Sequence, residues 1–417
     1  MKKFLLSSLA SVILSSPLMA GGYKIPEQSV NSTALSAAYV ANAHGADAAY
    51  YNPAAMVFNA DRSLLEADLS YIQLTPIDFD GSAFGESFED ETNREHFIIP
   101  TFHYSSPAVG NMRFGLSLVA PAGLSKRWGG TAEAAAEEFT LQTYEANPTV
   151  AFQLHESLSV AAGFRVVYSR GLVKSSPSAA AAVPIGRDLK GDSIDYGYNL
   201  AILVRPADNL SLAATYRSKI WLTIRGDADL DFPAAPAFNY SGDAKVDVPI
   251  PAALNLAAAY TFNNSKTTAE VVFERTFWSI YNELDFDYDR TFSAGHPFAA
   301  FDNPGIKNWV NSDSYRLGIT HQLNREWSLM AGFAYDETPV QKRYVGFDLP
   351  DSDAIMFSVG AKHRYTDSLT IGGALLYDRK KELKLDADDD NIKSGGITGK
   401  FKDASAIFVT VGVEYRF

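Results

Sequence analysis

The stretch that decides the fold closes the chain: Ser405-Ala406-Ile407-Phe408-Val409-Thr410-Val411-Gly412-Val413-Glu414-Tyr415-Arg416-Phe417. Every second residue from Ile407 to Phe417 is apolar, whereas Glu414 and Arg416 fall between them. Because successive side chains of a strand point to opposite faces, one face is a continuous apolar stripe and the other is partly polar. A strand between lipid and a polar lumen needs this pattern, and a strand of a buried sandwich shows it as well.

The first twenty residues predict export. Lys2 and Lys3 precede a mostly apolar run from Phe4 to Leu14, and Ala20 is a small residue before Gly21, so residues 1–20 are expected to be a secretory signal peptide. No later segment offers the ~20 apolar residues that a membrane helix needs. Cysteine is absent, which excludes a disulfide scaffold and thiolate chemistry.

Composition limits the remaining classes. With 20% charged residues the chain is too polar for a helical membrane protein, and with 12% aromatic residues it is too aromatic for a disordered one. A length of 417 residues fits either two or three soluble domains or one large barrel. The formal charge of −13 argues against nucleic acid as a partner.

Strand-like segments recur along the chain. In one of them Trp327, Leu329, Ala331, Phe333 and Tyr335 share a face. About fourteen such segments are expected, at 62–74, 94–105, 112–124, 139–154, 157–174, 191–205, 208–230, 241–262, 266–288, 311–323, 325–341, 352–365, 368–385 and 399–417.

The connections between these segments are of two kinds. Tight turns are expected at His155-Glu156, Pro206-Ala207-Asp208, Asn263-Asn264, Asn324-Arg325 and Thr366-Asp367. Longer links are expected around 75–93, 125–138, 175–190, 231–240, 289–310 and 386–398. Alternating short and long connections are typical of outer-membrane barrels, with turns in the periplasm and loops outside. The sequence therefore predicts an all-β fold: a transmembrane antiparallel β-barrel of about 14 strands in the outer membrane of a Gram-negative bacterium.

The segment before the first strand differs in composition. Residues 21–61 are rich in Ala, Ser and Gly, and short helices are expected at 32–43 and 46–51, the second stopped by Pro53. A barrel of about fourteen strands has a lumen wide enough to need filling. The segment is either a small periplasmic appendage or a helical hatch inside the lumen. The second reading divides the chain into a signal peptide (1–20), a hatch (21–61) and a barrel (62–417).

Several short blocks carry a family resemblance. They are Gly22 to Ser29, Gly45-Ala46-Asp47-Ala48, Asn52-Pro53-Ala54, Val248-Pro249-Ile250-Pro251, Phe277-Trp278-Ser279, Asp313 to Gly318, Phe333 to Val340 and Leu349 to Asp353. In this order, with a terminal Phe417, they resemble the FadL/TodX family of outer-membrane transporters for long-chain fatty acids and other hydrophobic compounds. The resemblance implies a monomeric barrel of about fourteen strands with an N-terminal hatch in the lumen. One departure is Ala354, where the family often has an arginine.

The resemblance also suggests site residues. Arg170 resembles a family position associated with the head group of the ligand; the alternative is a lumen arginine paired with a wall carboxylate. Asn52, Pro53 and Ala54 would act as the gate of the hatch.

A third set of candidate residues lies in the third strand. Pro121 has no N–H to give a neighbouring strand and Gly123 tolerates the backbone angles of a bulge, so the ladder should break at Pro121, Ala122 and Gly123. The resemblance implies a lateral opening there, through which an apolar cargo leaves without crossing water. The alternative is that Pro121 marks the outer end of the strand.

The chemistry of the cargo sets what such a site needs. An apolar tail gains roughly 0.8 kcal/mol per buried CH₂, and a carboxylate must meet a cation or donors. The expected partners are a long-chain fatty acid or another hydrophobic small molecule, with outer-membrane lipid and lipopolysaccharide around the barrel. Neutral hydrocarbons or monoaromatics would suit the same apolar pocket.

Two other classes of protein stay open. A general porin needs an open polar eyelet, which a small-residue hatch argues against. An enzyme needs a nucleophile, a base and an orienting group, and none of the 7 histidines sits in a recognisable catalytic motif. No cofactor and no metal site is expected; the acidic runs Phe88 to Glu91 and Asp386 to Asp390 read as solvated loops because they lack EF-hand spacing.

Overall fold

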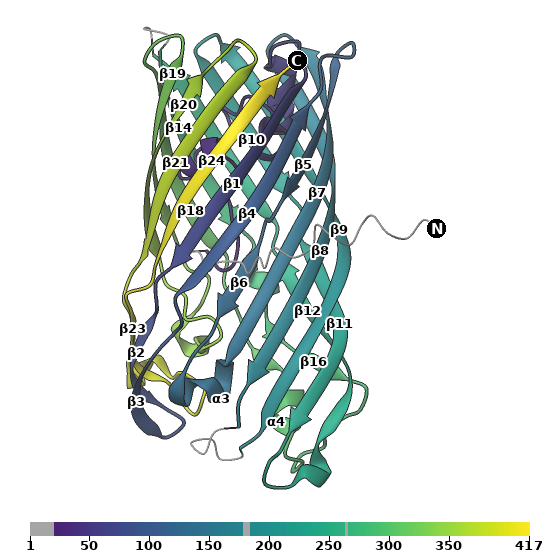
Figure 1. Cartoon of the computed structure of the whole chain (residues 1–417), viewed down its shortest axis with the longest axis vertical. Helices are drawn as coiled ribbons and strands as arrows, with labels where there is room; N and C mark the ends of the chain where they lie inside the picture. The colour runs from purple at the N-terminus through teal and green to yellow at the C-terminus, as the bar shows by residue number, and fades with distance from the viewer. Residues whose placement is uncertain (1–20, 178–183, 263–265) are drawn as a thin grey trace.

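The protein is an antiparallel β-barrel closed by its first and last strands. The computed structural model describes residues 21–177, 184–262 and 266–417, so the predicted signal peptide and the turn at Asn263-Asn264 lie outside the described residues. Strand β1 (Leu64–Leu74) pairs along its whole length with β24 (Ser405–Arg416), from Leu64 opposite Arg416 to Leu74 opposite Ala406. This pairing joins the two ends of the sheet into the tilted cylinder of Figure 1.

Fourteen strand spans make up the wall, as the sequence predicts. Within the described residues, ten are continuous: β1, β4 (Glu95–Ser105), β7 (Glu138–His155), β8 (Leu158–Ser175), β9 (Gly186–Ala207), β18 (Ser312–Gln322), β19 (Trp327–Asp336), β20 (Ala354–Arg364), β21 (Leu369–Lys380) and β24. The other four consist of two strands in line: β5 (Met112–Val119) with β6 (Gly123–Lys126), β10 (Leu210–Arg217) with β11 (Ile220–Asp231), β12 (Tyr240–Ile250) with β13 (Ala253–Thr261), and β14 (Thr267–Thr276) with β16 (Phe286–Tyr288).

The two ends of the barrel differ. The C-terminus and the tight turns lie at one end, called here the short-turn end, and the longer connections lie at the opposite, long-loop end (Figure 1). The predicted long link 75–93 contains two strands, β2 (Asp78–Ala83) and β3 (Glu86–Glu91). They form a four-stranded sheet with β22 (Leu383–Leu385) and β23 (Thr398–Lys402), which flank the predicted link 386–398. The reading of Phe88 to Glu91 as a plain loop is therefore wrong, although most of β3 is exposed.

Short elements complete the long-loop end. They are β15 (Glu283–Leu284) paired with β17 (Gly305–Ile306), helices α3 (Glu133–Ala136) and α4 (Ala299–Asp302), and 3₁₀ turns η2 (Gly130–Ala132), η3 (Pro236–Phe238), η4 (Trp278–Ile280), η5 (Lys342–Tyr344) and η6 (Ala387–Asp389). Among the described residues, no helix has the length and apolar character to cross a membrane.

The last strand has the two faces that its sequence predicts. Val411 and Tyr415 are 54% and 48% exposed on the outside, whereas Thr410 and Glu414 are 0% and 4% exposed on the inside. The outward residues of the neighbouring strands are also large and apolar, as at Leu69 and Leu375. The barrel therefore presents an apolar belt outward and a polar surface to its lumen.

A charge placed on the apolar belt should destabilise the protein. We expect Val411→Arg to lower the free energy of unfolding by about 2–4 kcal/mol, because the guanidinium would face hydrocarbon. Ile392→Arg is the matched control, since Ile392 is 44% exposed in a long-loop connection, where a surface substitution changes stability by about 0.5 kcal/mol or less. Equilibrium unfolding in lipid vesicles measures both values, and equal losses would contradict the assignment of the belt.

Candidate functional site

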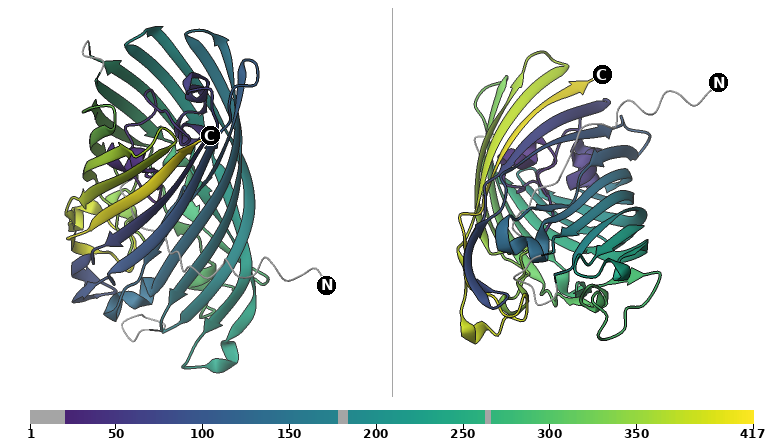
Figure 2. Two further views of the ribbon diagram at one scale, coloured as in Figure 1. Left: turned by 45° about the horizontal axis from the view of Figure 1, so that its top comes forward. Right: turned by 60° about the horizontal axis from the view of Figure 1, so that its bottom comes forward.

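Residues 21–61 form a compact segment against the inner faces of strands on several sides. It contains α1 (Val30–Ala34), α2 (Ala48–Tyr51) and the 3₁₀ turn η1 (Pro53–Phe58). Helix α1 contacts β19, β20, β21 and β24, α2 contacts β4 and β5, and η1 contacts β5, β7, β8 and β9. Figure 2 shows this segment, in purple, within the ring of strands.

The helices of this segment match the sequence prediction in part. Helix α2 agrees with the helix expected at 46–51, and it ends at Tyr51, before Pro53. The helix expected at 32–43 is wrong, because α1 ends at Ala34 and the next residues turn away. Ser36 and Ala37 have φ of 48° and 58°, which a right-handed helix does not allow.

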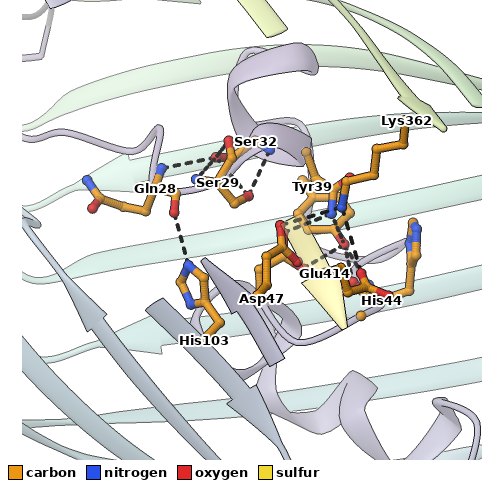
Figure 3. Close-up of polar contacts among 12 residues, drawn as sticks. Gln28, Ser29, Ser32, Tyr39, His44, Asp47, His103, Lys362 and Glu414 are labelled. Atoms are coloured by element: carbon orange, nitrogen blue, oxygen red, sulfur yellow. Dashed lines mark hydrogen bonds and ion pairs between the residues drawn. The ribbon is translucent and has the colours of Figure 1, made fainter. Parts of the chain in front are cut away.

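Buried polar contacts hold the segment in its fold (Figure 3). Asp47 accepts hydrogen bonds from Asn31 Nδ2 at 2.9 Å and from the Tyr39 hydroxyl at 3.1 Å. The carboxylate of Glu270 on β14 accepts from the backbone N–H groups of Val40 and Ala41 at 2.7 and 2.6 Å. The segment is therefore tied both to itself and to the wall.

Glycines of the wall make room for α1 and the residues after it. An added Cβ at Gly332 would collide with the backbone carbonyl of Leu35, and one at Gly360 would collide with Ala34. An added Cβ at Gly318 would meet the carbonyl of Ala38, and one at Gly372 would meet the side chain of Val30. This row of glycines lets a backbone lie directly on the sheet, where side chains would otherwise stand.

The wall has a break between β4 and the interrupted span β5–β6. Strand β4 pairs with β5 from Ser105 opposite Gly115 to Phe102 opposite Leu118, and no described residue of β4 beyond Phe102 pairs with β6. An isolated bridge between Thr92 and Trp128 closes the long-loop side. Nine residues of each chain lie between these two paired points: residues 93–101 on one side and residues 119–127 on the other.

The N-terminal segment covers the inner edge of this break. Lys24 forms an isolated antiparallel bridge with Ala122. The N–H of Ile25 donates to the carbonyl of Pro121 at 3.0 Å, and the N–H of Gly123 donates to the carbonyl of Tyr23 at 2.8 Å. The edge that β4 leaves unpaired is thus paired from inside the barrel.

A pocket adjoins the break on the lumen side. Its apolar lining includes Ile25, Pro53, Pro121 and Ile250, and Tyr50 and Tyr51 provide aromatic walls. It holds about 820 Å³ of empty space, including open solvent at its mouth. Because Pro121 belongs both to the pocket and to the break, the two are contiguous.

The pocket also carries an excess of positive charge on one side. The carboxylate of Glu145 binds two guanidinium groups: Arg165 Nη2 lies 2.9 Å from Oε2, and Arg217 Nη2 contacts Oε1. Arg217 lies over the ring of Tyr50, 4.3 Å from its centroid, and its buried Nη1 has no hydrogen-bond partner among the described residues. Two cations sharing one carboxylate leave a donor for an anionic group.

A second group of charges in the pocket is balanced. Lys24 Nζ lies 2.6 Å from Glu274 Oε1, and Arg316 Nη2 lies 3.3 Å from Asp336 and 3.6 Å from Glu274. These cations already have carboxylate partners. Arg217 also has a carboxylate partner, but its buried Nη1 has none among the described residues, so it is the better candidate for binding a ligand anion.

The structure places Arg170 away from this pocket. Its side chain is exposed on the face of β8 that also carries Phe164 and Tyr168, whereas Arg165 belongs to the buried, inward face. Both expectations for Arg170, a partner of the ligand head group and a lumen arginine paired with a wall carboxylate, are therefore wrong, because each requires an inward side chain. Counting the alternation along β8 would have separated the two arginines, because Phe164 and Tyr168 are apolar residues of the lipid-facing row.

The other predicted residues lie near the pocket. Asn52 is buried, donates to the carbonyl of Val40 at 2.9 Å, and accepts from the N–H of Ala54 at 3.2 Å. Pro53 lines the pocket, and the carbonyl of Ala54 accepts from Ser159 on β8 at 2.7 Å.

The three predicted opening residues lie at the interruption of the third span. Ala122 separates Pro121 from Gly123, where β6 begins. The φ of Gly123 is not positive, so the interruption does not use the backbone freedom expected of that glycine. Sequence reasoning did not identify Arg165, Arg217 or Lys24, which come together only in the closed barrel.

A closed barrel with an apolar belt, a polar lumen and an internal pocket is typical of outer-membrane transport proteins. The chain matches the family described as outer membrane protein transport protein (OMPP1/FadL/TodX) over residues 11–417, and it belongs to this family. It is therefore an outer-membrane protein. The family is one of transporters, which agrees with the expectation that the chain is not an enzyme.

Individual relatives match most of the length of the chain. The long-chain fatty acid transport protein of Escherichia coli K12 is 25% identical, with 93% of this chain and 94% of that protein covered. The solved structure of a Pseudomonas aeruginosa FadL homologue has a TM-score of 0.82 at 19% identity and covers 95% of this chain and 100% of that one. The Pseudomonas putida toluene transporter TodX has a TM-score of 0.71 at 17% identity, covering 93% and 99%.

A side chain at Gly332 should displace the N-terminal segment. We expect Gly332→Val to leave the barrel folded but to raise its ion conductance in planar bilayers, because Leu35 could no longer lie on β19. Gly373→Val is the matched control, since the nearest atom to its Cβ lies 3.8 Å away. Equal, low conductance of both folded variants would show that the segment tolerates displacement without opening the lumen.

Proposed function

We propose that the protein takes up long-chain fatty acids or related hydrophobic compounds passively across the outer membrane. In this proposal residues 21–61 act as a hatch in the lumen of the barrel formed by residues 62–417, with Asn52, Pro53 and Ala54 as its gate. The cargo enters the internal pocket and leaves sideways, through the break at Pro121, Ala122 and Gly123, into the membrane. The barrel works as a monomer surrounded by outer-membrane lipid and lipopolysaccharide.

The observation that carries the proposal is the contiguity of pocket and break at Pro121. A long apolar chain that left through the aqueous end of the lumen would lose roughly 0.8 kcal/mol for each CH₂ exposed to water. A sideways route avoids this loss. The resemblance to a long-chain fatty acid transport protein over 93% of the chain supports the same cargo class.

The charge of the pocket favours a cargo with an anionic head group. A carboxylate at Arg217 would satisfy Nη1, which otherwise stays buried without a partner. The alternative cargo is a neutral hydrocarbon or a monoaromatic, which the likeness to toluene transporters keeps open. A general porin is less favoured, because the buried segment 21–61 occupies the lumen.

Removing the guanidinium of Arg217 should separate the two cargo classes. We expect Arg217→Met to weaken binding of a long-chain fatty acid by roughly tenfold or more, because a hydrogen bond to a charged group contributes about 1.5–3 kcal/mol. Binding of the matching neutral hydrocarbon should be unchanged. Glu145 keeps Arg165 as its partner in this variant.

Arg170→Met is the control for that measurement, since Arg170 is exposed on the outer face. Titration calorimetry on the purified proteins compares the two ligands. Equal weakening for both ligands in Arg217→Met, or a fatty-acid defect in Arg170→Met alone, would contradict Arg217 as the head-group partner.

Blocking the break should stop uptake. We expect Gly123→Arg to abolish cargo uptake by whole cells while the barrel assembles and keeps its heat-modifiable migration on gels, because a bulky charge would stand in the exit. Gly129→Arg is the matched control, as its Cβ has no atom within 4 Å in the same connection. Uptake at the parental rate by an assembled Gly123→Arg protein would rule out the lateral route.

A further inference from the structure

The hydrogen-bond pattern between β4 and β5 defines where their ladder ends. The N–H of Ser106 donates to the carbonyl of Phe114 at 2.8 Å, and Phe102 lies opposite Leu118 in the same register. In an antiparallel ladder every second pair of opposite residues exchanges hydrogen bonds. Phe102 and Leu118 therefore form such a pair, and the next one along this register is Pro100 with Ala120.

Pro100 cannot complete that pair. It lies within β4 and pairs on its other side with Leu69 of β1, but proline has no N–H to donate to the carbonyl of Ala120. A central strand rarely holds a proline, because one ladder hydrogen bond is lost. The β4–β5 ladder therefore lacks the hydrogen bond from position 100 to Ala120. Ala120 is the residue directly before Pro121, where the opposite chain is interrupted.

The side chain of Gln28 provides the hydrogen-bond partners that Ala120 lacks, from inside the barrel. Its Nε2 donates to the carbonyl of Ala120 at 2.8 Å, and its Oε1 accepts from the N–H of Ala120 at 2.9 Å. A single side-chain amide thus replaces both backbone groups of a neighbouring strand. Gln28 is fully buried, so without it Ala120 would leave a donor and an acceptor unpaired.

Further contacts fix the position of Gln28 (Figure 3). Its carbonyl accepts from Nε2 of His103 on β4 at 3.0 Å, and Nδ1 of the same ring lies 3.0 Å from the hydroxyl of Ser117 on β5. Its N–H donates to the Tyr51 hydroxyl at 2.7 Å. The residue is therefore anchored to both edges of the wall at the point where they separate.

We propose that Gln28 and Pro100 are the positioning residues that set where the barrel wall opens. Pro100 withholds the N–H that would continue the ladder, and Gln28 satisfies Ala120 in place of β4. With an N–H restored at position 100 and the amide removed at position 28, β4 pairs further along the opposite chain and the break narrows. Only the expected effect on uptake rests on the proposed lateral exit; the expected change in strand pairing does not.

The test uses a disulfide as a reporter of pairing, which is possible because the chain has no cysteine. If the β4–β5 register continued, Ile98 and Ala122 would be the next hydrogen-bonding pair beyond Pro100 and Ala120. The reporter pair is therefore Ile98→Cys with Ala122→Cys. The reporter pair is placed in the wild-type background and with Gln28→Met, Pro100→Val, or both. Pro107→Val, in the turn after β4, is the matched proline control. Cross-linking after mild oxidation and uptake of a radiolabelled long-chain fatty acid under reducing conditions are measured on assembled protein.

We expect the cross-link to be scarce in the wild-type and Pro107→Val backgrounds and to form in the double variant, with uptake falling at least tenfold. Pro100→Val alone should give an intermediate yield, which keeps the test decisive if a protein lacking Gln28 fails to assemble. The proposal would be overturned if Pro100→Val and the double variant both assembled and their cross-link yields stayed at the wild-type level. A cross-link that forms while uptake stays at the parental rate would support the role of Gln28 and Pro100 and would count against the lateral exit.

Discussion

The structure depends on one constraint: hydrocarbon offers no partner to a backbone N–H or carbonyl, so the wall must satisfy every such group from within. The pairing of β1 with β24 meets this constraint around the circumference. At the break between β4 and β6, strand pairing leaves backbone N–H and carbonyl groups without a partner from the neighbouring strand. There the backbone of Tyr23 and Ile25 and the side chain of Gln28 take over. The N-terminal segment therefore takes part in the hydrogen bonding of the wall, in addition to its proposed role as a hatch.

The charges of the lumen follow from the same lack of water. Buried ions are tolerated when they are paired, because desolvation costs several kcal/mol per ion. Glu274 pairs with Lys24 and Arg316, and Lys362 lies between Glu66 and Glu414. At Glu145 the balance is different, since one carboxylate serves two arginines. The proposed binding of an anionic head group depends on this local imbalance, in a chain whose formal charge is −13.

Much of the fold can be predicted from the sequence because lipid imposes a simple period of two. All fourteen spans follow from it, and so do the two faces of the last strand. The strands β2 and β3 escape this reasoning, since outside the membrane no belt forces alternation. The helix expected at 32–43 fails for a tertiary reason: a chain lying on the glycines of β18 to β24 turns at Ser36 and Ala37.

The candidate site is less accessible to sequence reasoning. Arg170 and Arg165 lie five residues apart on one strand and differ only in the face they occupy, which the alternation does reveal. The meeting of Arg165 with Arg217 and Glu145 depends on register across β7, β8, β9 and β10, which no single strand encodes. The role of Pro100 depends on which neighbour its missing N–H would face. Local sequence contains no information on that choice.

The contacts of Tyr51 join the pocket to the wall. Tyr51 lines the pocket, and its hydroxyl accepts the N–H of Gln28 at 2.7 Å and donates to the carbonyl of Pro26 at 2.9 Å. Gln28 in turn holds Ala120 at the break. A molecule in the pocket therefore contacts the edge of the wall directly at Pro121 and lies one residue, Tyr51, away from Gln28. A segment that only filled the lumen would not need this chain of contacts. In the proposed mechanism, the same few side chains would therefore set both the space available to a cargo and the width of the break.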